Sequence, residues 1–303
     1  MKRKFTQQDA LTAIDLYIKG NQQKEIAKQL NCSQVSVSNI LLRNGVKTRI
    51  GKKIKYTDIN ISFFKEINCE ENAYFLGFLY ADGNVQINNN AYTVTLKLKS
   101  NDQMIIEKFR DIMSPSSSVK ITKNKGSENT YSYFRINQKE ICEQLILLGC
   151  IPNKSLILQF PKTIPKDLIK HFLRGYSDGD GSIYRNNFKG KSHANYIWKI
   201  VSTKQFCNSV SQILKEELNI SCSQSLSRPK TNQITTTLSV GGNNQSMKFL
   251  DWLYKDATIY LPRKYQKYLE FKDYLSSSKL ISDSSSVTTN ESPAISKLRR
   301  SSA

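Results

Sequence analysis

The sequence predicts an α+β protein in which one αββαββα unit occurs twice, as a pseudo-twofold duplication, after a small all-α domain. Two observations predict the duplication. A short pattern, an apolar helix that ends in Asp-Gly before a strand-like segment, stands at 75–83 and again at 173–181. After each copy, segments with strand and helix periodicity follow in the same order. Three short amphipathic segments between Phe5 and Arg49 predict the N-terminal helices.

Alternation of apolar and polar residues predicts the strands of each half. Val94, Leu96 and Leu98 alternate with threonines and lysines, so we expect one buried side and one wet, basic side. The first half is predicted to have strands at 85–87, 92–98, 119–123 and 131–137 and helices at 102–113 and 138–148. The second half is predicted to have strands at 183–184, 196–202, 223–227 and 234–240 and helices at 204–218 and 244–254.

Composition and the repeat divide the chain into five parts. These are a helix-turn-helix domain at 1–49, a basic linker at 50–60, a first half at 61–164, a second half at 165–275 and a tail at 276–303. The tail is rich in serine and has few large apolar residues, so it is predicted to be disordered.

The charge of the chain indicates a polyanionic partner. Its 303 residues include 45 basic and 25 acidic side chains, for a formal net charge of +20. Such an excess of one sign favours nucleic acid, and we expect double-stranded DNA. No apolar run is long enough to span a membrane and no signal-peptide core follows Met1. We therefore expect no membrane partner and an intracellular location, in a cytoplasm or nucleoid or in an organelle stroma or matrix.

Cysteine and histidine usage excludes several kinds of site. The six cysteines form no Cys-x-x-Cys pair and the chain has two histidines. The cysteines are predicted to be reduced core thiols, and a zinc site is not expected. A His-based nuclease site of the HNH kind and a Ser/His/Asp triad are disfavoured by the same shortage of histidine.

The N-terminal segment is predicted to fold as three helices. The first is predicted to bury Leu11, Ile14, Leu16 and Ile18. A second is predicted near 22–30, and Ser33 is expected to cap a third that continues through Arg43. Ala27, Val37 and Ile40 have the sizes that lock a helix-turn-helix, and the segment resembles the helix-turn-helix of resolvases and transposases.

That resemblance implies a DNA-reading third helix. The residues expected to face base edges are Ser33, Gln34, Ser36, Ser38 and Asn39, and those expected to reach phosphates are Arg43, Lys47 and Arg49. The alternative interpretation is a three-helix module that binds protein.

Asp82 and Asp180 are the candidate centre of the chemistry. Each is predicted at a helix C-terminus, where a carboxylate faces the negative end of the helix dipole at a cost of roughly 0.3–1 kcal/mol. Gly77 and Gly175 are small enough to let the two helices approach closely. If the helices lie side by side, the carboxylates meet and can hold a divalent cation, Mg²⁺ or another such as Mn²⁺, against a phosphate.

The repeated pattern resembles the LAGLIDADG motif, after which a family of homing endonucleases is named. The resemblance covers roughly 56–275 and is to the single-chain, two-motif members. Gly77 and Gly175 match the third position of the motif, and Asp82 and Asp180 match the eighth.

Two positions depart from the motif. The sixth, usually acidic, is Tyr80 in the first copy although Asp178 keeps it in the second, and Arg174 replaces a small residue at position two. Because the sixth position is not a metal ligand of the family, these changes concern the packing of the helix ends.

The resemblance implies a fold and an activity. It implies two antiparallel sheets that form a saddle over DNA, with Asp82, Asp180 and the carbonyls of Ala81 and Gly179 at the metals. Lys154 and Lys264 each stand two residues beyond a proline, which is predicted to stiffen a loop and so present the lysine. The resemblance further implies that these two lysines assist at the phosphate. The implied reaction is metal-assisted hydrolysis of both DNA strands across the minor groove, which leaves short 3′ extensions.

The wet faces of the strands are expected to read sequence in the major groove. The candidates are Gln86, Asn88, Thr93, Thr95, Lys97, Arg185, Asn187, Lys199, Thr235 and Thr237. A monomer is expected. Two alternatives remain open: a catalytically silent DNA-binding regulator, and an intron maturase that binds intron RNA.

Overall fold

The computed structural model describes residues 6–48, 58–88, 91–124, 126, 128–187, 194–227 and 235–287. The chain forms two compact units, with the division between Lys55 and Tyr56. Within the described part, no helix combines the length and the apolar character that a membrane span requires.

The described residues of the N-terminal unit form three helices, as the sequence predicts. They are α1 (Gln7–Ile18), α2 (Gln23–Gln29) and α3 (Gln34–Arg43). Thr6 caps α1 by accepting from the backbone of Asp9 at 3.2 Å, and Ser33 caps α3 by accepting from the backbone of Ser36 at 3.1 Å. The predicted cap at Ser33 is therefore confirmed. The core of the unit consists of Ala13, Tyr17, Ile26, Ala27, Val37 and Leu41.

The predicted buried side of α1 is partly wrong. Leu11 and Ile18 are 56% and 73% exposed, whereas Ala13 and Tyr17 are buried. Leu11 and Ile18 are seven positions apart and share one face of the helix, and Ala13 lies on the opposite face because successive residues turn by about 100°. The aromatic ring of Tyr17 fills the core that the sequence assigned to isoleucine.

In the larger unit, the described strands form two sheets with one topology. The first joins β1 (Gly83–Asn88), β2 (Ala91–Lys99), β4 (Thr130–Ile136) and β3 (Lys120–Lys123) in the order β1-β2-β4-β3. The second joins β5 (Ser182–Asn187), β6 (Ala194–Ser202), β8 (Thr236–Val240) and β7 (Ser223–Leu226) in the order β5-β6-β8-β7. All of these pairs are antiparallel. The predicted α+β duplication is confirmed.

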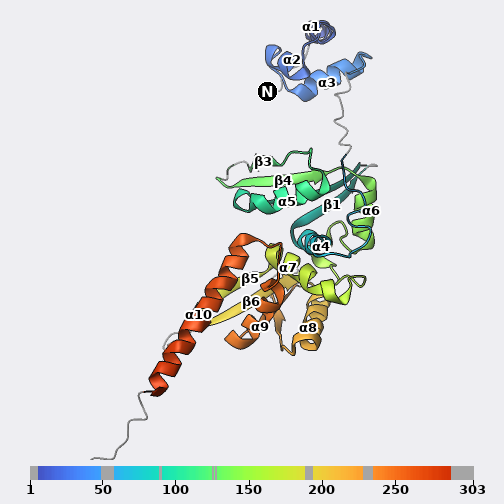
Figure 1. Ribbon diagram of the computed structural model, residues 1–303. Coiled ribbons are helices and arrows are strands. Elements are labelled where there is room, and N and C mark those ends of the chain that lie inside the picture. Colours follow the sequence, from blue (N-terminus) through green and yellow to red (C-terminus); the bar gives the residue numbers. More distant parts are fainter. Residues whose placement is uncertain are drawn as a thin grey trace, which may run out of the picture. The chain divides into compact units, whose positions relative to one another are not determined.

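The helices repeat in the same order. The first half has α4 (Glu70–Asp82), α5 (Gln103–Met113) and α6 (Lys139–Leu147), with short 3₁₀ turns at Ser100–Asp102 and Lys154–Leu156. The second half has a 3₁₀ turn at Lys166–Leu168, then α7 (Ile169–Asp180), α8 (Lys204–Leu218), α9 (Asn243–Tyr254) and α10 (Pro262–Val287). Figure 1 shows α4 and α7 next to each other at the middle of this unit, with one sheet on each side.

One continuous core joins the two halves. Val94, Leu96 and Leu98 are buried as their alternation predicts, and Trp198 and Ile200 occupy the matching places of the second sheet. The apolar residues of α4 and α7 belong to the same core. The two halves are therefore packed on each other through their motif helices and not only joined by the chain.

The predicted C-terminal tail is partly wrong. Helix α10 continues to Val287, although the sequence predicts disorder from 276. Tyr268 and Phe271 are buried at helical spacing, and no glycine or proline between Pro262 and Pro293 ends the helix. Residues 288–303 lie outside the described residues.

The end of the predicted linker is anchored to the first half. Asp58 accepts hydrogen bonds from the backbone of Ser116 at 2.7 Å and from the hydroxyl of Ser114 at 3.0 Å. The backbone N–H of Asn60 donates to the carbonyl of Met113 at 2.8 Å. Residues 58–60 are therefore part of the larger unit and not of a free linker, because these bonds hold them at the end of α5.

Candidate active site

Helices α4 and α7 contact each other through their backbones. A Cβ placed on Gly77 would lie 2.0 Å from the carbonyl oxygen of Phe172, and one on Gly175 would lie 1.9 Å from that of Tyr74. No side chain fits at such distances, so glycine is required at both positions. The close approach predicted from the small residues is confirmed.

The C-terminal ends of the two helices meet. A Cβ on Gly179 would lie 2.4 Å from the Cβ of Ala81 and 3.1 Å from a carboxylate oxygen of Asp82. Asp82 is half-buried and Asp180 is exposed. The structure therefore brings the two acids, predicted from sequence at equivalent positions, to one place.

The acid pair is electrostatically unfavourable without a cation. Burial and then the charge of Asp180 raise the pKa of Asp82, against the charges of Lys154 and Lys264, and the result is a pKa of about 6. Although Asp180 is exposed as a residue, the protein around its carboxylate displaces water and so raises its pKa, against the same two lysines. A bound divalent cation would favour the ionised form of both carboxylates.

Lys154 and Lys264 occupy matching places beside the acids. The ammonium group of Lys154 donates to the carbonyl oxygen of Gly83, and that of Lys264 donates to the carbonyls of Gly181 and, at 3.0 Å, Ser177. Each lysine thus binds the residue that directly follows one of the two acids. Burial lowers the pKa of Lys264 to about 8, and Asp178 opposes the shift.

The segments that carry these lysines differ from the predicted loops. Lys264 lies in the first turn of α10, and Lys154 lies in a 3₁₀ turn. Pro262 begins α10, a position where its missing N–H has no cost, so the proline that was expected to stiffen a loop begins a helix.

Asp178, at the sixth motif position, is a structural acid. It is fully buried and accepts hydrogen bonds from the Tyr74 hydroxyl at 2.9 Å, the Tyr254 hydroxyl at 2.5 Å and the Leu261 N–H at 2.7 Å. The Tyr80 hydroxyl, at the same position of α4, donates to the carbonyl of Leu148 at 2.5 Å. Sequence reasoning did not find these contacts because the partners of Asp178 and Tyr80 lie far from them along the chain.

Arg174, at the second motif position, joins three segments. Its guanidinium donates to the carbonyls of Ile259 at 2.8 Å and Leu253 at 2.9 Å and pairs with Glu70. The Glu70 carboxylate also accepts from the backbone of Thr258 at 2.9 Å. The side chain that departs from the family pattern is therefore a buried tether between the start of α4 and the chain before α10.

Arg174→Met should lower the free energy of unfolding by about 3–5 kcal/mol, because it keeps much of the volume but leaves Glu70 without its cation and two buried carbonyls without their donor. Urea unfolding followed by circular dichroism measures the change. The matched control is Lys166→Met, which removes an ion pair to Glu217 whose lysine side chain is 79% exposed and should cost less than about 1 kcal/mol. Equal midpoints for the two variants would contradict a tethering role for Arg174.

The oxygen atoms at the helix ends suit a hard divalent cation. The available donors are the carboxylates of Asp82 and Asp180 and the carbonyls of Ala81 and Gly179. Magnesium retains several waters and needs only one or two protein carboxylates, so two acids are enough when a phosphate supplies further oxygens. Elsewhere in the described ranges, no three His, Cys, Asp or Glu side chains come together as a metal cluster.

One face of the first sheet is polar and basic. The register pairs Gln86 with Thr93 and Lys97 with Tyr133, and alternation along each strand places all five predicted residues of this sheet on that face. They are Gln86, Asn88, Thr93, Thr95 and Lys97. Sequence reasoning missed others on the same face, namely Asn84, Lys99, Lys120, Thr122, Tyr131, Tyr133 and Arg135.

Aromatic rings support the cations of this face. The Lys97 ammonium lies 4.8 Å from the centre of the Tyr131 ring, and the Arg135 guanidinium lies 5.7 Å from that of Tyr133. The alternation of Tyr131, Tyr133 and Arg135 with buried residues was the signal that could have identified them from sequence.

The second sheet presents a more neutral face. Lys199 and Thr237 lie on it, with Tyr184, Asn195 and Ser239 beside them, and Thr235 lies two residues before Thr237. Lys199 is the cation of this face within the described strands, whereas the matching face of the first sheet carries Lys97, Lys99, Lys120 and Arg135.

Arg185 and Asn187 do not lie on the predicted face. Both share the side of buried Ile183, and the Arg185 guanidinium lies 4.9 Å from the centre of the Tyr274 ring of α10. The physical reason is the two-residue period of a strand, in which 183, 185 and 187 point the same way. Tyr184 and Asn186 face the polar side instead.

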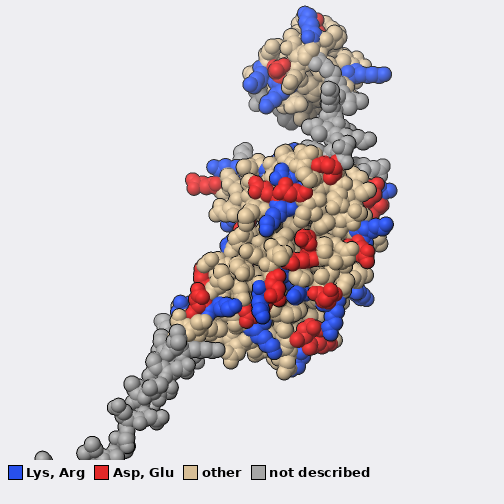
Figure 2. Space-filling view, viewed as in Figure 1, with Lys and Arg blue, Asp and Glu red and all other residues tan. Residues whose placement is uncertain are grey.

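The polar faces of the two sheets differ from other parts of the surface. No acidic side chain lies on either face within the described strands. Figure 2 shows a face of the larger unit on which acidic side chains are interspersed with basic ones. On the described sheet faces, basic side chains are therefore not interspersed with acidic ones.

Helix α3 presents part of the predicted reading surface. Gln34, Asn39, Arg43 and Lys47 are exposed, whereas Ser36 and Ser38 are half-buried. The Ser33 hydroxyl is engaged as the helix cap, so it is less available for a base than the sequence suggested. Arg49 lies outside the described residues. Val35 and Leu42 are 68% and 65% exposed on the same helix.

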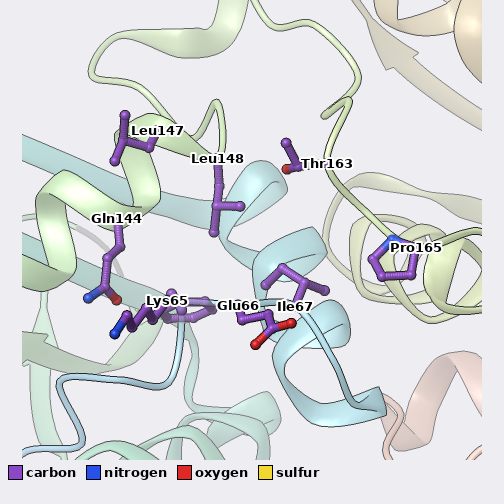
Figure 3. A pocket seen from close by; sticks show the side chains of 9 residues that line it. Lys65, Glu66, Ile67, Gln144, Leu147, Leu148, Thr163 and Pro165 are labelled. Atoms are coloured by element: carbon purple, nitrogen blue, oxygen red, sulfur yellow. The ribbon is translucent and has the colours of Figure 1, made fainter.

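Two hollows lie away from the acid pair. One, of about 410 Å³, is lined by Lys65, Glu66, Gln144, Leu147, Thr163 and their neighbours, as Figure 3 shows. The other, of about 380 Å³, shares Leu147, Leu148 and Thr163 with it. Neither is lined by Asp82 or Asp180. The acid pair therefore does not lie in either hollow.

Comparisons with known proteins give structural similarity without sequence similarity. No family model matches the chain, and no curated protein matches it. Similar solved structures include I-SmaMI bound to uncleavable DNA (14% identity over 69% of this chain and 90% of that chain, TM-score 0.46). They also include the homing endonuclease I-WcaI bound to its DNA recognition sequence (12% identity, 72% and 94%, TM-score 0.47). A third is the LAGLIDADG homing endonuclease I-GzeII in complex with its DNA target (14% identity, 72% and 93%, TM-score 0.45). With identities this low and TM-scores below 0.5, the similarity alone establishes no function.

Proposed function

We propose that this chain is a site-specific DNA endonuclease of the LAGLIDADG homing type, which hydrolyses both strands of a duplex. The observation that carries the proposal is the meeting of Asp82 and Asp180 at the joined ends of α4 and α7, each beside a buried lysine. The acids stand where β1 and β5 begin, so the chemistry adjoins two sheets with acid-free polar faces.

The chain supplies the oxygens that would hold a divalent cation, Mg²⁺ or another such as Mn²⁺. These are the carboxylates of Asp82 and Asp180, with the carbonyls of Ala81 and Gly179. When bound, such a cation lowers the pKa of a bound water and neutralises charge at the phosphate. Each half of the duplicated unit would supply one acid and one lysine for the cleavage of one DNA strand.

The lysines would place positive charge beside the reacting phosphates. Their hydrogen bonds to Gly83 and Gly181 fix each ammonium group next to an acid, so little reorganisation is needed when DNA binds. Because the two acids share one place, the scissile phosphates must be close in space, a condition that B-DNA meets across its minor groove. Cleavage there leaves short 3′ extensions.

Binding would use both units of the chain. The sheet faces would read the major groove, and α3 would read a neighbouring stretch of the same duplex, which raises the effective concentration of each unit for the other. One chain carries both acids, so a monomer suffices. A DNA substrate further implies a compartment that holds DNA, such as a nucleoid or an organelle matrix.

The direct test is cleavage of a plasmid that carries the chain's own locus without the inserted gene. With Mg²⁺, supercoiled plasmid should become linear, and EDTA should prevent it. A regulator would bind this plasmid and leave it intact. An intron maturase would bind structured intron RNA in preference to duplex DNA at moderate salt.

Replacing Lys97 and Arg135 with alanine should reduce the salt dependence of duplex binding. If both contact phosphates, the slope of log K against log salt should fall by about two. Fluorescence anisotropy between 50 and 200 mM salt measures this slope. Over that range the affinity of the wild-type chain should fall by about 10³-fold. The matched control replaces Lys108 and Lys255, which are exposed on or beside helices, and should leave the slope unchanged. Equal slopes for both double variants would place the DNA elsewhere.

A further inference from the structure

Tyr80 and Asp178 stand at the same position of the two motif helices, two residues before Asp82 and Asp180. Each side chain binds the backbone of the segment that leads to a buried lysine. The Tyr80 hydroxyl donates to Leu148 at 2.5 Å, ahead of Lys154. The Asp178 carboxylate accepts from the N–H of Leu261 at 2.7 Å, ahead of Lys264. Two chemically different side chains thus make equivalent contacts.

The Tyr80 side chain is buried, and together with Leu148 and Gly149 it lines the second hollow, of about 380 Å³. The Tyr80 ring meets that of Phe172 edge to face, with centroids 5.1 Å apart. A Cβ on Gly149, whose φ is +91°, would lie 2.3 Å from the Tyr80 hydroxyl oxygen. The segment beyond α6 therefore reaches Tyr80 only because residue 149 is a glycine.

Both lysines depend on these segments for their place. Lys154 is 9% exposed and Lys264 is 4% exposed, and each donates to the end of its own motif helix. Burying an ammonium group is costly unless it is hydrogen-bonded, so each lysine depends on the backbone segment that keeps it within reach of these carbonyls. Neighbouring contacts add support, since the thiol of Cys150 lies 3.6 Å from the carbonyl of Leu79.

We propose that Tyr80 and Asp178 are positioning residues, each of which holds the lysine of its own half beside the reacting phosphate. The inference rests on the proposed nuclease function and deepens it. Because each lysine stands beside one acid of the pair, the loss of one tether should slow cleavage of one DNA strand and spare the other. A side chain that served stability alone would affect both strands.

The test is Tyr80→Phe, which keeps the ring and its contact with Phe172 and removes only the hydroxyl. Cleavage of each strand is followed separately under single-turnover conditions on a duplex labelled at both ends. We expect one strand to be cut roughly tenfold more slowly, since small displacements of a reacting group cost at least that much, and nicked product to accumulate. The slowed strand should be the one that Lys154→Met slows, and in the Lys154→Met background Tyr80→Phe should add nothing. Asp178→Asn should slow the other strand.

The matched control is Tyr176→Phe, which removes another buried hydroxyl of the helix pair, one bonded to Ser202 at 3.0 Å. It should cause no strand bias. Equal slowing of both strands by Tyr80→Phe, or an added effect in the Lys154→Met background, would overturn the inference.

A second measurement keeps the inference testable if the wild-type chain does not cleave DNA, which would instead overturn the proposed function. Reductive methylation followed by mass spectrometry reports the reactivity of each lysine. Tyr80→Phe should increase the modification rate of Lys154 several-fold relative to Lys264, and an unchanged ratio would refute the tether.

Discussion

Asp82→Asn and Asp180→Asn should each abolish double-strand cleavage while leaving duplex affinity within about twofold. Asparagine keeps the size of the side chain but removes the charge that holds a cation at the helix ends. Loss of one preorganised electrostatic group costs about 10²–10³ in rate, so linear product should fall below detection in a plasmid assay. Gel shift on the same DNA measures binding. Full activity in either variant would defeat the assignment of the acids.

The same variants should be no less stable than the wild-type chain at neutral pH in EDTA. Asp82 has a pKa of about 6 in the folded protein against an ordinary value of 3.8. An acid whose pKa is higher in the folded state stabilises that state when the pH is below its pKa in the unfolded chain. This stabilisation is lost as the pH rises through its pKa in the folded protein. The contribution of Asp82 to the free energy of unfolding should therefore rise as the pH falls from about 6 toward 4. His171, whose pKa burial lowers to about 4, contributes the opposite trend over this range, so the difference between the wild-type chain and Asp82→Asn isolates the contribution of Asp82. Lower stability of the variant at pH 7 would mean that its inactivity reflects unfolding.

Gly77→Ala and Gly175→Ala should be the most destabilising small substitutions in the larger unit. The added methyl group would meet a backbone carbonyl of the facing helix at 2.0 or 1.9 Å, and a backbone cannot swing away as a side chain can. Overpacking commonly costs 1–3 kcal/mol, and we expect about 3 kcal/mol or more here. Chemical unfolding measures the loss.

The control for these variants is Gly241→Ala. A Cβ at Gly241 would meet nothing within 4 Å, and its backbone does not adopt a positive φ. This variant should change stability by less than about 1 kcal/mol. If Gly77→Ala and Gly241→Ala had similar unfolding midpoints, the two motif helices would not be in backbone contact.

The sequence was sufficient for the duplicated scaffold and for the centre of the site. Two copies of the motif supplied Asp82 and Asp180, and the small residues Gly77 and Gly175 predicted the helix contact. Lys154 and Lys264 could be paired because each follows a proline at the same distance. The local sequence pattern was enough to predict these features because each of them occurs a second time in the other half of the repeat.

Other features depend on contacts that a sequence does not contain. Asp178 and Arg174 are buried charges whose partners come from distant segments, and nothing near them in the chain identifies those partners. The side of the sheet on which Arg185 lies depends on where β5 begins. If the start of a strand is misplaced by one residue, every side chain of that strand is assigned to the wrong side. The serines of α10 led to a prediction of disorder, because composition alone does not show that the buried rings of Tyr268 and Phe271 anchor this segment as a helix.

The proposed divalent-cation site lies at the junction of α4 and α7, where the carboxylates of Asp82 and Asp180 would hold it. Its most direct test is an anomalous difference map from crystals of the full chain grown with duplex DNA and Mn²⁺. We predict anomalous density within coordination distance of both carboxylates, with a phosphate oxygen in the same shell. Density bound elsewhere, with these carboxylates bare and no phosphate beside them, would contradict it.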